Sequence, residues 1–214
     1  LAFAIPKRKE ILFCFLFGII IYIIFIFTDG RIIKDAESIT FGFGPIIKSI
    51  LNNSGYKASN ILYPGGVNHD SYAHRMPLIP IWFAFFGGNI KLATFIRALF
   101  FGFISLPAIR MLKKMSGEKI TIYALFIILL SPLFLRRIVD ITNEESWLSI
   151  FIPCSFIGMC YLKERLEDRR EECLSTGIYV SILLALSYLT KSSMLYLAVA
   201  VLMFIFIRSY RLRE

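Results

Sequence analysis

The chain has 214 residues, of which 57% are hydrophobic, and it carries a formal net charge of +9 at pH 7. A mean hydropathy of +0.69 and 21 Phe residues exclude an ordinary soluble globular domain and indicate an integral membrane protein. The positive charge does not indicate nucleic-acid binding, because Lys and Arg form clusters beside apolar runs rather than a surface interleaved with aromatic residues.

Apolar runs set the expected fold. Each is about 16 to 21 residues long, close to the length of helix that crosses a hydrocarbon layer about 30 Å thick. The sequence therefore predicts an all-α polytopic membrane protein with about six transmembrane helices. They are expected at residues 11–28, 92–112, 120–135, 147–162, 173–190 and 192–207. The first run lacks a small-residue cleavage site, so we interpret it as a retained anchor.

The Lys and Arg clusters predict the orientation. They occur before the first run, between the second and third, between the fourth and fifth, and after the sixth. All four clusters then fall on one side, which is the cytoplasmic side for short basic connections. We expect a multi-pass protein of the plasma (inner) membrane with both termini cytoplasmic. The outer side receives the loop 29–77, the segment 136–146 and the turn at Lys191.

The outer loop 29–77 is the longest connection in the chain, and long loops in compact proteins are commonly functional. Within it, residues 45–52 place apolar side chains at helical spacing, which predicts a short amphipathic helix on the membrane surface. After the loop, residues 78–86 are apolar but too few to span. Gly87, Gly88 and Asn89 then interrupt the chain, so we expect a short interfacial or re-entrant helix here.

The metal-ligating residue types are scattered. Three of the four cysteines lie within apolar runs, the fourth lies at a cytoplasmic edge, and the two histidines stand alone in the outer loop. Neither a disulfide framework nor a metal site is implied by this spacing, and no cofactor is expected.

Four short motifs occur in order on the outer side. They are Asp35-Ala-Glu37-Ser, His74-Arg75-Met-Pro-Leu-Ile-Pro80, Thr142-Asn-Glu144-Glu145 and Leu189-Thr190-Lys191. Together with the amphipathic helix, this order resembles the GT-C-type membrane glycosyltransferases that take sugars from polyprenyl-phosphate carriers. That group includes protein O-mannosyltransferases and aminoarabinose transferases. The resemblance covers nearly the whole chain as a pattern, and implies a single GT-C-like transmembrane domain over residues 1–214, truncated at its C-terminus.

The resemblance assigns roles to these residues. Asp35 would act as the catalytic base, since a carboxylate can take the proton of an incoming hydroxyl. Asp29 and Asp70 remain alternatives, because the acidic motif is not a contiguous Asp-Glu pair. Arg75 and Lys191 would stabilise the departing lipid phosphate.

Further residues have lesser roles in this hypothesis. Glu37, His74 and Glu144 would contact substrate, and Arg136 and Arg137 are further candidate cations. Glu144 serves equally well as a helix N-terminal charge. Arg97, a few residues inside the second predicted span, is interpreted as a side chain that snorkels to the interface.

The expected function is transfer of a hexose or pentose from a polyprenyl-phosphate donor to a lipid, glycan or protein acceptor on the non-cytoplasmic face. Membrane lipids are the other expected partners, with no nucleic acid. The alternative is a transporter or lipid-handling membrane subunit without chemistry of its own. Transporters tend to place charges and broken helices near the bilayer midplane at the interface of repeats. Here the polar residues gather at outer ends and no repeat is visible, which favours the enzyme.

Overall fold

A computed structural model describes residues 5–27, 47, 50–52, 78–131, 144–165, 170–201 and 203. Within these ranges the structure is helical, with no strand. The longer helices are α1 (Arg8–Phe27), α5 (Ile90–Ser116), α8 (Glu144–Arg165) and α9 (Arg170–Thr190). The shorter ones are α4 (Leu78–Phe85), α6 (Glu118–Leu130) and the 3-10 turn η2 (Ser192–Met194), from which a helix continues to Val201.

Three helices of the described residues are long and apolar enough to cross a membrane. They are Ile90–Ser116 in α5, Ser146–Lys163 in α8 and Glu172–Thr190 in α9. This finding confirms an all-helical chain with membrane-length helices, whereas six spans remain a prediction. The 20 residues of α1 make a helix about 30 Å long. By contrast, the 13 described residues of α6 reach only about 20 Å.

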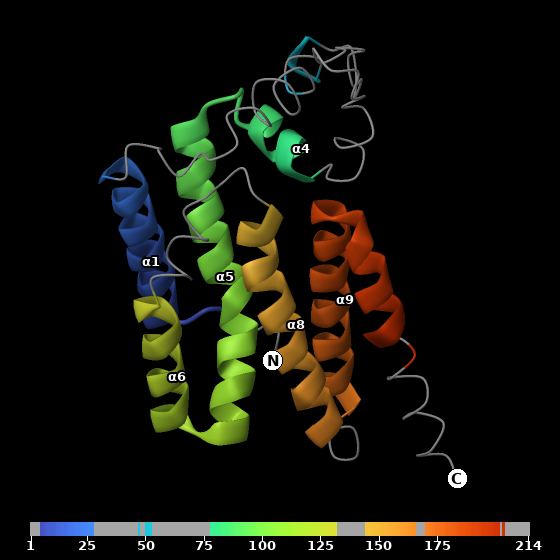
Figure 1. The fold of residues 1–214 in the computed structure, drawn as a ribbon. Helices are drawn as coiled ribbons and strands as arrows, with labels where there is room; N and C mark the ends of the chain where they lie inside the picture. The colour runs from blue at the N-terminus through green and yellow to red at the C-terminus, as the bar shows by residue number, and fades with distance from the viewer. Residues whose placement is uncertain are drawn as a thin grey trace.

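The helices run side by side in a bundle whose central member is α5 (Figure 1). α5 packs against α1, α6 and α8, and α8 packs in turn against α9. In Figure 1, α1 and α9 ascend while α5 and α8 descend, and the shorter α6, which lies between α5 and α8 in the chain, ascends. α4 lies across the upper end, where it contacts α5 and α9.

The connection between α4 and α5 is built from the residues that the sequence singles out. Gly87 and Gly88 have φ of 63° and 76°, a left-handed conformation that glycine adopts without strain. Asn89 then caps α5, since its side-chain oxygen accepts a hydrogen bond from the Leu92 amide at 3.1 Å. The predicted short helix before this break and the predicted break itself are both confirmed.

Small residues let α1 approach α5 closely. Cys14 and Gly18 are four residues apart on α1, and a Cβ built at Gly102 of α5 would lie 3.2 Å from the Cα of Cys14. A Cβ built at Gly18 would lie 2.6 Å from a methyl carbon of Leu99. Such small-residue faces allow two helices to pack backbone against backbone within a membrane.

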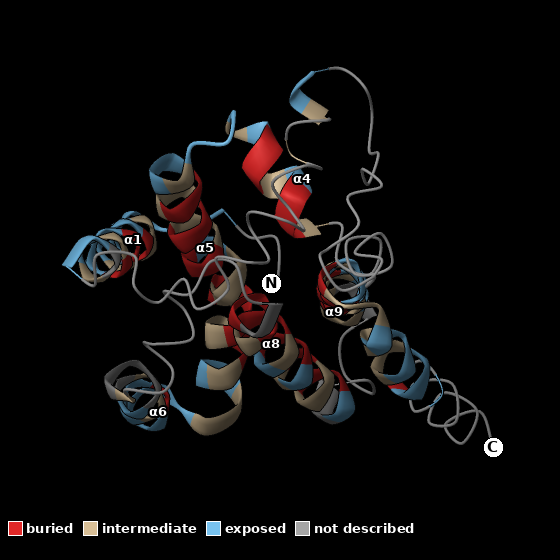
Figure 2. Cartoon of the chain, turned by 45° about the horizontal axis from the view of Figure 1, so that its top comes forward, coloured by how far each residue is buried: buried red, intermediate tan, exposed pale blue. Residues whose placement is uncertain are grey.

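Buried residues concentrate on α4, α5, α8 and α9, while α6 is largely exposed (Figure 2). Much of the core near α4 is aromatic: Trp147 lies edge-on to both Trp82 and Phe101, with ring centroids 5.3 Å apart in each pair. Lower in the bundle, the Tyr179 hydroxyl of α9 donates to the Ile104 carbonyl of α5 at 2.6 Å, in the turn preceding Pro107. This hydrogen bond joins α9 to the middle of α5.

Candidate functional site

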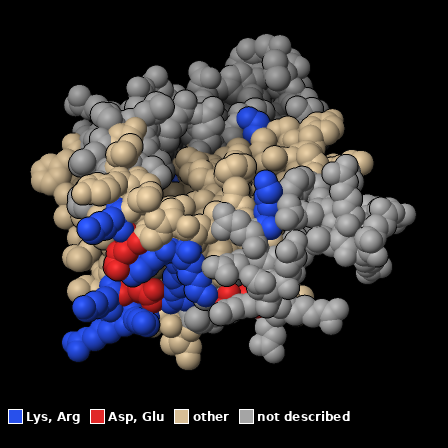
Figure 3. All heavy atoms as spheres, turned by 90° about the horizontal axis from the view of Figure 1, so that it is seen from below, with Lys and Arg blue, Asp and Glu red and all other residues tan. Residues whose placement is uncertain are grey.

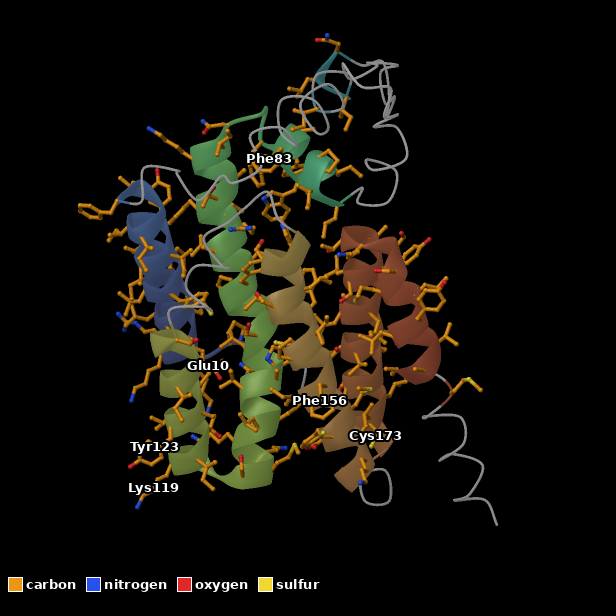
Figure 4. The ribbon with its side chains drawn as sticks, viewed as in Figure 1. Glu10, Phe83, Lys119, Tyr123, Phe156 and Cys173 are labelled. Atoms are coloured by element: carbon orange, nitrogen blue, oxygen red, sulfur yellow. The ribbon has the colours of Figure 1, made fainter. Side chains whose placement is uncertain are left out.

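The lower end of the bundle is an ion-pair network. Arg110 of α5 binds Glu10 of α1 through two hydrogen bonds, from Nε to Oε1 at 2.8 Å and from Nη2 to Oε2 at 2.6 Å. Figure 4 shows Glu10 between these two helices. Its bond with Arg110 lowers the pKa of Glu10 to about 2. This bidentate geometry is the strong form of an arginine–carboxylate contact.

Two further ion pairs extend the network to α6 and α9. Lys113 Nζ lies 2.8 Å from Glu118 Oε1, and Lys114 Nζ lies 3.2 Å from Glu172 Oε1. The Tyr161 hydroxyl of α8 also donates to Glu172, at 2.6 Å. Lys and Arg side chains interspersed with acidic ones gather on one part of this end in Figure 3.

The described helix ends beside three of the four predicted basic clusters, namely the start of α1, the end of α5 and the end of α8, lie at this end of the bundle, as the sequence predicts (Figure 1). The fourth, at 208–213, lies outside the described residues. Because the ion pairs join residues from four different helices, this end has a structural role.

The upper end gathers the start of α5, the start of α8, the end of α9 and the whole of α4 (Figure 1). Two residues predicted for the site lie there. Glu144 is the first residue of α8, and Lys191 lies between α9 and η2, where its extended backbone (φ −152°, ψ 115°) ends the helix. The other predicted residues lie outside the described part of the chain: Asp35, Glu37, His74 and Arg75, the alternatives Asp29 and Asp70, and Arg136 and Arg137.

Arg97 is a buried cation near this upper end. Its side chain is 1% exposed, so the interpretation that it snorkels to the interface is wrong. Nη1 donates a hydrogen bond of 2.8 Å to the hydroxyl of Ser146, in the first turn of α8. The guanidinium carbon also lies 5.3 Å from the ring centroid of Phe101 and 5.6 Å from that of Trp147. The polar and aromatic contacts together offset the loss of hydration.

Trp82 connects α4 to the same cluster. Its Nε1 donates to the Ala93 carbonyl of α5 at 3.1 Å, and its ring stacks edge-on against Trp147. Trp82 is half-buried, and Phe83, the next residue of α4 (labelled in Figure 4), is buried. Helices α4, α5 and α8 are therefore joined by one set of side chains, which we call the Arg97 cluster: Trp82, Arg97, Phe101, Ser146 and Trp147.

An apolar cavity of about 280 Å³ lies between α1, α5, α6 and α8. Its walls include Phe13 and Phe17 of α1, Gly102 of α5 and Ile150 of α8, and among the described lining residues the hydroxyls are those of Ser105 and Ser149. A space with this lining suits a hydrocarbon chain rather than a polar substrate.

The described residues contain no group of three or more His, Cys, Asp or Glu side chains placed to hold a metal ion. No protein-family model, curated protein or solved structure matches the chain. The chemistry of the upper end is therefore argued from its own residues.

Sequence reasoning missed the Arg97 cluster as a unit. One signal was present, because an ionisable residue within a membrane-length apolar run is by default a functional-site hypothesis. The sequence did not reveal which helix would supply the partners of Arg97. Ser146 is 49 residues further along the chain, so only the packing of α8 against α5 brings the two together.

Proposed function

We propose that this chain belongs to a membrane glycosyltransferase that moves a sugar from a polyprenyl-phosphate donor to an acceptor on the non-cytoplasmic face. The observation that supports the proposal is that three helix ends beside predicted site residues lie together at one end of the bundle. These are the start of α4, which follows Arg75 by three residues, the first turn of α8 at Glu144, and the turn at Lys191. They lie opposite the ion-pair network, which in this proposal faces the cytoplasm.

In the proposed reaction, the Asp35 carboxylate takes the proton of the acceptor hydroxyl as that oxygen attacks the sugar. Arg75 and Lys191 stabilise the lipid phosphate, which gains negative charge as the glycosidic bond breaks. Glu37, His74 and Glu144 contact the sugar or the acceptor. The protein is multi-pass in the plasma (inner) membrane with both termini cytoplasmic, and the apolar cavity accommodates part of a lipid chain.

The decisive experiment uses Asp35→Asn in the full-length protein. This change keeps the size and most hydrogen bonding of the side chain but removes the basic oxygen. Sugar transfer should fall by a factor on the order of 10² to 10⁴, while binding of the polyprenyl-phosphate sugar survives. Asp29→Asn and Asp70→Asn are the matched controls, with small expected effects. Full activity in the Asp35 variant together with loss of activity in either control would assign the role of catalytic base to Asp29 or Asp70 instead.

The cations provide a second test. Arg75→Ala or Lys191→Ala should slow transfer by about 10²-fold or more, the usual cost of one electrostatic contact in a transition state. Lys119→Ala is the control, because Lys119 is exposed at the opposite end of the bundle (Figure 4). Transfer rates of both test variants equal to that of the control would remove these two residues from the site.

The second candidate is a transporter or lipid-handling subunit without catalysis. The observation that favours it is Arg97, a buried cation inside a membrane-length helix, since such residues often mark transport pathways. Reconstituted vesicles distinguish the two functions. The transporter is supported if a polyprenyl-phosphate sugar crosses the bilayer without transfer to any acceptor, and if none of the three aspartate changes affects this movement. That result would contradict the glycosyltransferase proposal.

A further inference from the structure

We infer that Arg97 is a positioning residue that fixes the first turn of α8, which begins at Glu144 at the outer end of the bundle. The inference has a structural part, which stands on the contacts of the Arg97 cluster. Its catalytic part rests on the proposed function, because Glu144 is one of the residues assigned to the site.

The placement of Arg97 needs a specific cause. A guanidinium that is 1% exposed has lost its hydration, and a buried charge is tolerated only where fixed polar and aromatic groups surround it. A long Arg side chain near a helix end would otherwise extend to water. Arg97 instead turns inward, so the contacts that it makes there determine the position of its head group.

Two contacts of Arg97 are with consecutive residues in the first turn of α8. Ser146, itself 0% exposed, accepts the hydrogen bond, and the ring of Trp147 lies beside the guanidinium carbon. The opposite partner, Phe101, is on α5 one turn beyond Arg97. The guanidinium therefore bridges the two helices at the point where α8 begins.

The first turn of a helix frays easily, because its amide groups have no acceptors within the helix. A fixed contact there decides whether the turn frays and how the preceding residues leave it. Trp82 extends the constraint to α4, since its Nε1 donates to the Ala93 carbonyl of α5 and its ring packs edge-on against Trp147. Helix α4 and the first turn of α8 thus share one buried support on α5.

The structural part is tested by amide hydrogen exchange of the full-length protein in lipid nanodiscs. The amides of residues 148–151 report on the first turn, because in an α-helix they bond to the carbonyls of residues 144–147. In Arg97→Gln and in Ser146→Ala, exchange of these amides should be faster by about 10- to 100-fold, the range expected for loss of a hydrogen bond to a charged group. Arg97→Lys retains a charged donor and should recover part of the protection.

Two matched controls remove a buried or half-buried hydroxyl without touching the bridge. Thr94 Oγ1 bonds to the Ile90 carbonyl within α5, and Ser149 Oγ bonds to the Ser146 carbonyl within α8. Thr94→Ala and Ser149→Ala should leave exchange at 148–151 within about threefold of the wild type. Should Arg97→Gln fail to fold, Ser146→Ala decides the question. Exchange in Ser146→Ala no faster than in Ser149→Ala refutes the anchoring role.

The catalytic part is read from the steady-state parameters. A residue that orients a loop without touching the substrate should change kcat more than KM, because a displacement of about 1 Å can cost as much as 10²-fold in rate. We expect Arg97→Lys to lower kcat by about 10-fold or more, with the donor KM within about twofold. A rise in the donor KM alone would make Arg97 a substrate contact instead. If the wild type transfers no sugar, the proposed function fails, and the exchange measurement still decides the anchoring role.

Discussion

Gly102→Ala is the sharpest test of the packing between α1 and α5. The added Cβ would lie 3.2 Å from both Cα and Cβ of Cys14, and 3.4 Å from its carbonyl oxygen. Two of these atoms belong to the backbone of α1, so no side-chain rotation can relieve the contact. α1 must shift away from α5 by a few tenths of an ångström along this interface.

The expected cost follows from two opposing terms. Alanine is favoured over glycine in a helix interior by roughly 0.5–1 kcal/mol. Overpacking at a close helix contact costs about 1–3 kcal/mol. Gly177→Ala in α9 measures the first term alone, because a Cβ built there meets no atom within 4 Å and only the helix propensity changes. The difference in unfolding free energy between the two variants should therefore be about 1–3 kcal/mol.

The measurement is thermal unfolding in detergent micelles, followed by tryptophan fluorescence. Both tryptophans, Trp82 and Trp147, belong to the Arg97 cluster and report on the packed core. A chain of this size shifts its Tm by about 2–4 °C per kcal/mol, so Gly102→Ala should melt about 2–12 °C below Gly177→Ala. Equal melting temperatures, or a higher one for Gly102→Ala, would refute the close approach of α1 to α5.

Three further predictions concern the ion-pair network, the start of α5 and the membrane orientation. Arg110 lowers the pKa of Glu10 from 4.5 to about 2, so the pair stabilises the fold fully above pH 4.5, and this stabilisation is lost as the pH falls toward 2. Between these pH values, the Tm of Glu10→Gln should therefore vary less than the wild-type Tm. Asn89→Ala removes the cap of α5 and should cost about 1 kcal/mol in thermal unfolding, whereas Asn89→Asp, which keeps an acceptor oxygen, should not. In intact cells, a cysteine at Asn143 should react with an impermeant thiol reagent and one at Glu167 should not; labelling of Glu167 alone would reverse the proposed orientation.

Much of the fold could be predicted from the sequence, because its signals are local. Apolar runs of membrane length predict helices wherever they occur, and the described bounds of α5, α8 and α9 extend the predicted runs by only a few residues. The Gly87-Gly88-Asn89 break follows from the backbone freedom of glycine and the capping side chain of asparagine. Glu144 at the start of α8 and Lys191 after α9 are helix-end positions in the sequence and in the structure.

The sequence by itself determined that this chain is helical, suited to a membrane, and basic at one end of its helices, since each of these depends on composition and spacing along the chain. Only the tertiary structure decided which helices meet. Arg110 binds Glu10 across 100 residues, and Gly102 faces Cys14 on another helix. The same dependence explains Arg97. Whether a long cationic side chain extends to water or turns inward is set by the partners that a neighbouring helix offers, and those partners exist only once α8 has packed against α5.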